Sequence, residues 1–136
     1  MAALTEPRKD THERTGRERT VGVSAGVTCF AGGGAVLSGG FAEPATTATG
    51  LRSLGRFEET VDNSGGADGD KTVRIRKGVF PFANSAAADE IVAADIGNDC
   101  YWVDDQTVAK TSATSTRSVA GKVYDVDADG VWVELG

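Results

Sequence analysis

The sequence is poor in the residues on which many enzymes and cross-linked proteins depend. It has one histidine, two cysteines and three prolines among 136 residues. Cys29 and Cys100 are too few for a disulfide framework or a four-cysteine zinc site. The only histidine, His12, lies in a polar N-terminal segment, so a mechanism that needs a buried imidazole base has no candidate. We therefore expect a protein that is not an enzyme and that needs no cofactor.

Long apolar runs are also missing. No run of about 18 apolar residues is present, which argues against a membrane-spanning helix. The N-terminus has no apolar stretch after Leu4 and so lacks the pattern of a secretory signal. We expect no membrane partner.

Charge divides the chain into two parts. The sequence carries 14 Lys and Arg against 20 Asp and Glu, a net charge of −6. The first 20 residues hold five basic and four acidic side chains, whereas the other 116 hold nine and 16. We expect residues 1–20 to form a polar arm, extended or disordered until bound, and residues 21–136 to form an acidic body. Because an acidic body repels phosphates, we expect no nucleic-acid partner.

Glycine, by contrast, is abundant, with 18 residues or about 13 per cent of the chain, roughly twice its ordinary usage. Glycine destabilises helix interiors but suits tight turns, so this composition favours short strands. Within Lys71–Lys77, Val73 and Ile75 alternate with arginines, as in a strand buried on one face. The segments with strand-like patterns are Val21–Thr28, Ala35–Leu37, Phe41–Glu43, Leu51–Val61, Lys71–Lys77, Gly78–Ala83, Cys100–Val103, Thr107–Lys110, Val119–Val126 and Val131–Leu135.

Turn chemistry between these segments completes the predicted fold. Residues 104–106 and the Asp-Gly turn at 127–130 fit hairpin connections, and Pro81 favours an edge position or a bulge. Residues Ser85–Asp95 are the one plausible helix. The spacing predicts a mainly all-β protein, a small β-barrel or β-sandwich of about seven to nine short strands, with one short helix and an extended N-terminal arm.

Two acidic segments are weak candidates for a cation site. Asp125, Asp127 and Asp129 match the first half of a calcium loop, but the twelfth position, where a bidentate Glu belongs, is Gly136. A hairpin turn whose carboxylates face water explains the same residues. The glycine-rich loop Asp62–Asp70 holds three aspartates without ligand spacing, which favours a flexible hairpin connection.

Seven aromatic residues, Phe57, Phe80, Phe82, Tyr101, Trp102, Tyr124 and Trp132, could form a stacking platform for single-stranded nucleic acid. Acidic residues follow both tryptophans, however, and such platforms need a basic groove. Core packing is the better interpretation, and a patch that faces a partner is the second.

Three segments together resemble a known family. They are "AEPATTATGLRSLGRFEETVDNSGGADGDKTVRIRKGVFPFANS" (Ala42–Ser85), "AADIGNDCYWVDDQTVAKT" (Ala93–Thr111) and "AGKVYDVDADGVWVEL" (Ala120–Leu135). They are similar to the head decoration, or capsid cement, proteins of tailed phages and prophages. The similarity covers nearly the whole chain from about Val21 to Leu135.

The resemblance implies a non-enzymatic, β-rich protein on the outer surface of a tailed-phage virion, present in the host cytoplasm before assembly. There it would cement neighbouring major capsid protein subunits and stabilise the mature head. It also implies self-association, a trimer first and a dimer second. The basic residues of the arm are the expected shell contacts: Arg8, Lys9, Arg14, Arg17 and Arg19. The alternative function is a phage tail or baseplate component, or a surface module that binds carbohydrate through its aromatic residues.

Overall fold

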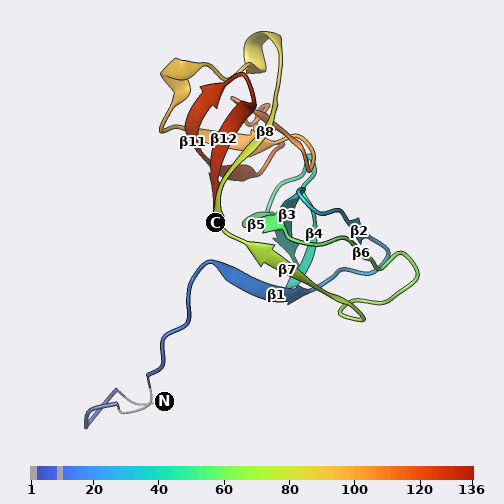
Figure 1. Cartoon of the computed structure of the whole chain (residues 1–136), viewed down its shortest axis with the longest axis vertical. Helices are drawn as coiled ribbons and strands as arrows, with labels where there is room; N and C mark the ends of the chain where they lie inside the picture. The colour runs from blue at the N-terminus through green and yellow to red at the C-terminus, as the bar shows by residue number, and fades with distance from the viewer. Residues whose placement is uncertain (1–2, 9–10) are drawn as a thin grey trace.

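The computed structural model describes residues 3–8 and 11–136 (Figure 1). This part of the chain contains twelve strands and two short 3-10 turns, η1 (Ala87–Asp89) and η2 (Ala93–Asp95). The strands are β1 (Glu18–Gly22), β2 (Thr28–Cys29), β3 (Gly34–Ser38), β4 (Phe41–Pro44), β5 (Arg52–Phe57), β6 (Val61–Asp62), β7 (Thr72–Arg76), β8 (Gly78–Asn84), β9 (Asp99–Trp102), β10 (Thr107–Ala109), β11 (Val119–Asp127) and β12 (Gly130–Leu135). The predicted all-β class is confirmed. The strands outnumber the prediction because several are only two or three residues long.

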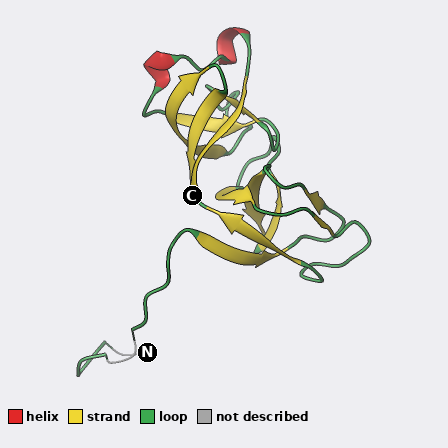
Figure 2. Cartoon of the chain, in the orientation of Figure 1, coloured by secondary structure: helices red, strands yellow, loops and turns green. Residues whose placement is uncertain are grey.

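The strands build two halves, which Figure 2 shows one above the other. The first half is a five-stranded sheet in the order β1-β7-β5-β3-β4, accompanied by the small pair β2-β6. The second half is a closed five-stranded barrel in the order β10-β8-β12-β11-β9. Between them, only Lys77 separates β7 from β8. The sheet therefore feeds directly into the barrel, and the N-terminal arm leaves from the sheet half.

Each half has its own buried cluster of apolar side chains. In the sheet, Val73 and Ile75 of β7 are 0% and 1% exposed, as their alternation with arginines predicts. They pack with Val23, Cys29, Ala35, Ala42, Leu54 and Phe57. The barrel cluster contains Phe82, Ile91, Cys100, Trp102, Val108, Ala120, Val123, Val131, Val133 and Leu135, together with Val36 and Ala45 from the sheet half. Because the sheet contributes side chains to the barrel core, the two halves pack against each other.

Polar contacts reinforce this junction. The Ser118 hydroxyl donates to the Ala48 carbonyl at 2.7 Å and accepts from the Leu51 amide at 3.0 Å. The Arg56 guanidinium lies 4.1 Å from the ring centroid of Phe80 in a cation–π contact. These contacts join the sheet half to the barrel and stabilise the packing of the two halves against each other.

The predicted helix over Ser85–Asp95 is wrong. The segment forms η1 and η2, separated by extended backbone at Glu90, and Ala87 has a positive φ of 55°. Ile91 is 1% exposed within the barrel core, and the Asn84 side chain bonds both its amide and its carbonyl, at 2.9 and 2.8 Å. Burial of Ile91 and its two hydrogen bonds with the Asn84 side chain stabilise the extended segment. They outweigh the weak preference of its alanines for a helix.

Two further details of the sheet half differ from expectation. The predicted strand Val21–Thr28 is interrupted, because Gly26 turns the chain with a φ of 75° between β1 and β2. The loop Asp62–Asp70 is not a hairpin connection: β6 pairs with β2, whereas β7 pairs with β1 and β5. In contrast, the predicted hairpins β9–β10 and β11–β12 are both present.

Candidate functional site

The N-terminal arm remains outside both cores. Residues 3–8 and 11–17 are exposed and contain no strand, and Leu4 is 72% exposed. Figure 1 shows this segment leaving the sheet half and running away from the body. The β1 strand begins at Glu18, so the last residues of the predicted arm belong to the sheet.

Two contacts anchor the base of the arm to β7. The Lys77 amide donates to the Arg17 carbonyl at 2.7 Å, which extends the β1–β7 ladder by one residue pair. The Arg76 guanidinium binds the Glu18 carboxylate through Nε at 3.1 Å and through Nη2 at 2.5 Å. This hydrogen bond, followed by the charge of Arg76, lowers the pKa of Glu18, and the same bond raises the pKa of Arg76. The arm therefore starts from a fixed point on the sheet.

The anchor belongs to a small network of charges across three strands. Arg76 Nε also lies 3.7 Å from a Glu58 carboxylate oxygen, and Glu58 in turn accepts from Arg56 at 2.8 Å. Arg74 pairs with Glu59 at 2.6 Å on the same sheet. These side chains are partly or largely exposed, so each pair contributes little to stability alone. They pair Arg56, Arg74 and Arg76 with carboxylates of the same half of the protein.

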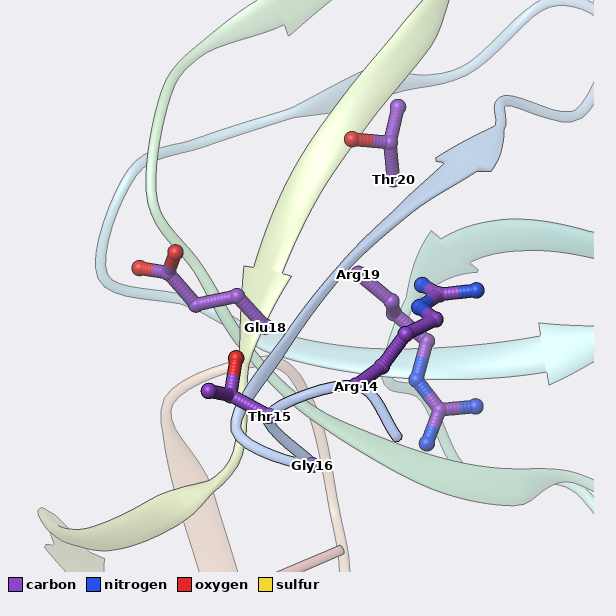
Figure 3. Close-up of a pocket in the computed structure, with 6 residues that line it drawn as sticks. All are labelled: Arg14, Thr15, Gly16, Glu18, Arg19 and Thr20. Carbon is purple, nitrogen blue, oxygen red and sulfur yellow. The ribbon is translucent and has the colours of Figure 1, made fainter. Parts of the chain in front are cut away.

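A groove of about 420 Å³ lies where the arm meets β1, and it is lined by Arg14, Thr15, Gly16, Glu18, Arg19 and Thr20. Figure 3 shows the side chains of Arg14 and Arg19 projecting to one side of β1 and that of Glu18 to the other. The Glu18 carboxylate is paired with Arg76, so it does not neutralise the arginines. The side of β1 that carries Arg14 and Arg19 is therefore positively charged. We call residues 14–20 the arm hinge.

A second groove, of about 570 Å³, adjoins the arm hinge on the side of the barrel. Gly16 and Arg17 line it together with Lys77, Gly78, Val79, Tyr124, Glu134, Leu135 and Gly136. Tyr124 is 62% exposed there. The base of the arm thus lies beside the barrel strands β8, β11 and β12.

The five arm residues predicted to contact a partner have different surroundings. Arg8 is exposed, and Lys9 lies outside the described residues. Arg17 contributes its carbonyl to the anchor. Arg14 and Arg19 line the same groove, although they are separated in sequence. The count of charged residues along the sequence identified these residues as a group, but it did not indicate that Arg14 and Arg19 line one groove.

The candidate calcium residues form a hairpin end instead of a ligand cluster. Asp127 caps this turn: one carboxylate oxygen accepts from the Asp129 amide at 2.8 Å and the other from the Trp132 indole at 2.9 Å. Asp125 accepts the adjacent Val126 amide at 2.9 Å. Within residues 3–8 and 11–136, no group of three or more His, Cys, Asp or Glu side chains is placed to hold a metal ion.

The acidic loop of residues 62–70 is built around a buried amide. Asn63 is 1% exposed, and its Nδ2 donates to the carbonyls of Val23, Ser24 and Ala67 at 3.3, 2.9 and 3.0 Å. Two loop aspartates, Asp68 and Asp70, accept backbone amides at 2.7 and 2.8 Å. The aspartates of this loop therefore bond the backbone and hold the loop in shape.

The aromatic residues divide between the core and the surface. Phe57, Phe82 and Trp102 are buried, as core packing predicts. Tyr124 is exposed, and so is Phe30, which sequence reasoning did not select. Phe30 lines a groove of about 390 Å³ with Ala31, Gly32, Gly33, Asp105 and Gln106. Burial, with a smaller contribution from the charge of Asp104, raises the pKa of Asp105 beside this aromatic ring.

Both cysteines are buried free thiols. Burial raises the pKa of Cys29 to about 11 and that of Cys100 to about 12. A thiol with such a pKa holds little thiolate near neutral pH, and the thiolate is the reactive form. These cysteines thus pack as small apolar residues.

We expect the native thiols to react with an aromatic disulfide reagent at pH 8 at least about 100-fold more slowly than a free small thiol. After denaturation in guanidinium chloride, both cysteines of each chain should react. The released chromophore, followed by absorbance, measures both rates. Rapid stoichiometric reaction of the folded protein would contradict the burial of these side chains.

None of the helical segments in the described part of the chain is long and apolar enough to cross a membrane. No protein-family profile, curated protein or solved structure matches the sequence or the fold.

Proposed function

We propose that this protein decorates the outer surface of a tailed-phage capsid and cements neighbouring major capsid protein subunits, in a role that requires no catalysis. The observation that carries the proposal is a stable β-body with an exposed, charge-mixed arm anchored at a fixed point on its sheet. The sequence resemblance to head decoration proteins supports it independently.

The arm provides the reach that a cement protein needs. Residues 1–16 can span up to about 55 Å when extended, at roughly 3.4 Å per residue. Such a segment becomes ordered on binding and covers a large area relative to its mass. Because Arg17 and Glu18 are bonded to the sheet, a bound arm would also fix the position of the body. Repetition of the contact over a closed shell then adds avidity.

The acidic body suits the outer position. Its negative charge favours solubility and disfavours contact with packaged nucleic acid. Arg8 and the rest of the arm before the hinge are the proposed shell contacts. Copies of this chain and the major capsid protein are the proposed partners, with the virion surface as the final location and the host cytoplasm as the place of synthesis.

The proposal is tested on purified phage heads. The protein should co-sediment with heads in a fixed ratio to the major capsid subunit, as measured by quantitative gel densitometry. Its presence only on tails, seen by immunogold labelling, would contradict a head role and support the tail or baseplate alternative.

Removal of residues 1–13 is expected to weaken binding to bare heads at least about tenfold, because the contact area of the arm is lost while the arm hinge and β1 are kept. Binding is measured by titration of heads followed by sedimentation. Circular dichroism should show an unchanged fold. Equal affinity of the truncated and full-length proteins would remove the arm from the mechanism.

A second candidate function rests on the exposed aromatics. Phe30 is 57% exposed in a groove beside the half-buried Asp105, and an aromatic face next to a carboxyl group is an arrangement that suits sugar rings. A surface module that binds carbohydrate would use this groove. Binding of Phe30→Ala and wild-type protein to a glycan array distinguishes this function, since a cement protein requires no such binding.

A further inference from the structure

The arm hinge carries positive charge that no ion pair among the described residues neutralises. Seven ion pairs occur among residues 3–8 and 11–136, and neither Arg14 nor Arg19 takes part in any of them. Both side chains line one groove and project to the same side of β1 (Figure 3). Guanidinium groups bind carboxylates with paired hydrogen bonds, so two of them on one wall form a receptor for an acidic segment.

The backbone beside these arginines is also open. Among the described residues, β1 is the edge strand of its sheet and pairs with β7, while Val23, just beyond its end, forms a parallel bridge with Ala42 of β4. Lys77 donates to the Arg17 carbonyl and Val23 to the Lys71 carbonyl, which directs the backbone groups of the odd-numbered residues toward β7. In an antiparallel ladder, those of Glu18 and Thr20 then point to the open edge. An extended segment can hydrogen-bond to them by strand addition.

The same chain presents a segment of complementary charge. At the β11–β12 hairpin, Asp125, Asp127 and Asp129 are exposed, and none of them belongs to any of these seven ion pairs. Asp127 is used within the turn and one oxygen of Asp125 accepts the Val126 amide, which leaves the second oxygen of Asp125 and the carboxylate of Asp129 for a partner. β11 pairs with β9 as far as Lys122, and the Val123 backbone bonds Gly97 and Asn98, so, within the described part of the chain, residues 125–127 pair with β12 alone. The hairpin is thus negatively charged and the hinge positively charged, and each has a strand edge open to a partner.

Among the described residues, no ion pair joins the hinge to the hairpin of the same molecule. The end of β12 lies beside the hinge, because Leu135 pairs with Gly78 and lines the groove that contains Gly16. The hairpin turn is at the other end of β12, about 17 Å away at roughly 3.3 Å per residue. Figure 1 likewise shows the arm leaving from the sheet half, opposite the far end of the barrel.

We propose that the arm hinge binds the β11–β12 hairpin of a second copy of this chain, with Arg14 and Arg19 facing Asp125 and Asp129. The contact is head-to-tail, since it joins two different surfaces. Such contacts generate a closed ring when their rotation closes and a filament when it does not. The arm before the hinge remains available for another partner. This inference rests on the self-association named in the proposed function and identifies the two surfaces that meet, and its test needs no phage heads.

Charge reversal on each surface provides the test. The hinge variant is Arg14→Glu with Arg19→Glu, and the hairpin variant is Asp125→Lys with Asp129→Lys. Asp127 is left intact because it caps the turn. Arg52→Glu, at an exposed arginine on β5 outside the ion pairs, is the matched control. Each is measured by sedimentation velocity over a concentration series at low salt.

We expect the wild-type protein and Arg52→Glu to associate equally, and either double variant alone to associate at least about tenfold more weakly. An equimolar mixture of the two double variants should regain association, because the reversed hinge of one fits the reversed hairpin of the other. Raising the salt to about 1 M should weaken the wild-type complex. A monomeric wild-type protein, unchanged association of both variants, or a mixture that stays dissociated would each overturn the inference.

Discussion

Replacing Trp102 with alanine is expected to lower the free energy of unfolding by about 3–5 kcal/mol, the cost of truncating a large buried aromatic side chain. Trp102 is fully buried, and its ring meets Phe82 edge-to-face at 5.1 Å. It also packs against the sheet half: a Cβ built on Gly34 would lie 2.2 Å from its Cη2 atom. Truncation thus opens a cavity where barrel and sheet meet.

Two variants separate packing from other effects of the substitution. The indole nitrogen of Trp102 is buried without a hydrogen-bond partner among the described residues, so Trp102→Phe loses no bond seen there and should cost less than alanine. Trp132→Ala is the matched control, since Trp132 is only partly buried and donates to the exposed Asp127. Urea titrations followed by circular dichroism measure all three. A loss for Trp102→Ala no larger than for Trp132→Ala would contradict the central packing role of Trp102.

The local part of this fold could be predicted from the sequence. Alternation at residues 72–76, the Asp-Gly turn at 129–130 and the acidic turn at 104–106 all determine structure over a few residues, and each predicted element forms. Pro81 lies opposite Trp132 and outside the short β8–β10 pairing, as its missing amide requires. Hydrophobic period and turn chemistry are sufficient at this range.

Features that depend on distant contacts could not be predicted. The alanine-rich segment around Ile91 has helical propensity, yet burial of one isoleucine and its two hydrogen bonds with the Asn84 side chain override it. Likewise, the pattern around Gly34 contains no sign that Trp102, far along the chain, needs the space of a missing Cβ. Tertiary packing decides both.

The candidate site shows the same division. Composition identified the arm and its basic residues, because a polar segment with Leu4 as its one large aliphatic residue cannot form a core. The position of the hinge depends on the Lys77–Arg17 and Arg76–Glu18 contacts, which join residues about 60 positions apart. Only the fold therefore separates Arg14 and Arg19, which share a groove, from Arg8, which does not.

Converting Asn63 to aspartate tests whether the acidic loop has a defined core, and we expect it to lower the free energy of unfolding by about 3 kcal/mol at pH 7. The Asn63 amide donates to three carbonyl oxygens in a site that is 1% exposed. A carboxylate there would replace the donor with a negative charge that faces those oxygens. The folded state should therefore raise the pKa of the new carboxyl group.

The sign of the pH dependence follows from that shift. Between the unfolded and folded pKa values the folded variant binds more protons, so its stability relative to wild type falls as pH rises from about 4 toward 7. Urea titrations at several pH values measure the difference, with the exposed Asn98→Asp as the control of equal charge. A loss that is equal at pH 4 and pH 7, or no larger than that of Asn98→Asp, would show that the Asn63 amide does not organise the loop. A loss confined to higher pH assigns the stability of residues 62–70 to one buried donor, and explains how so acidic a loop holds its shape.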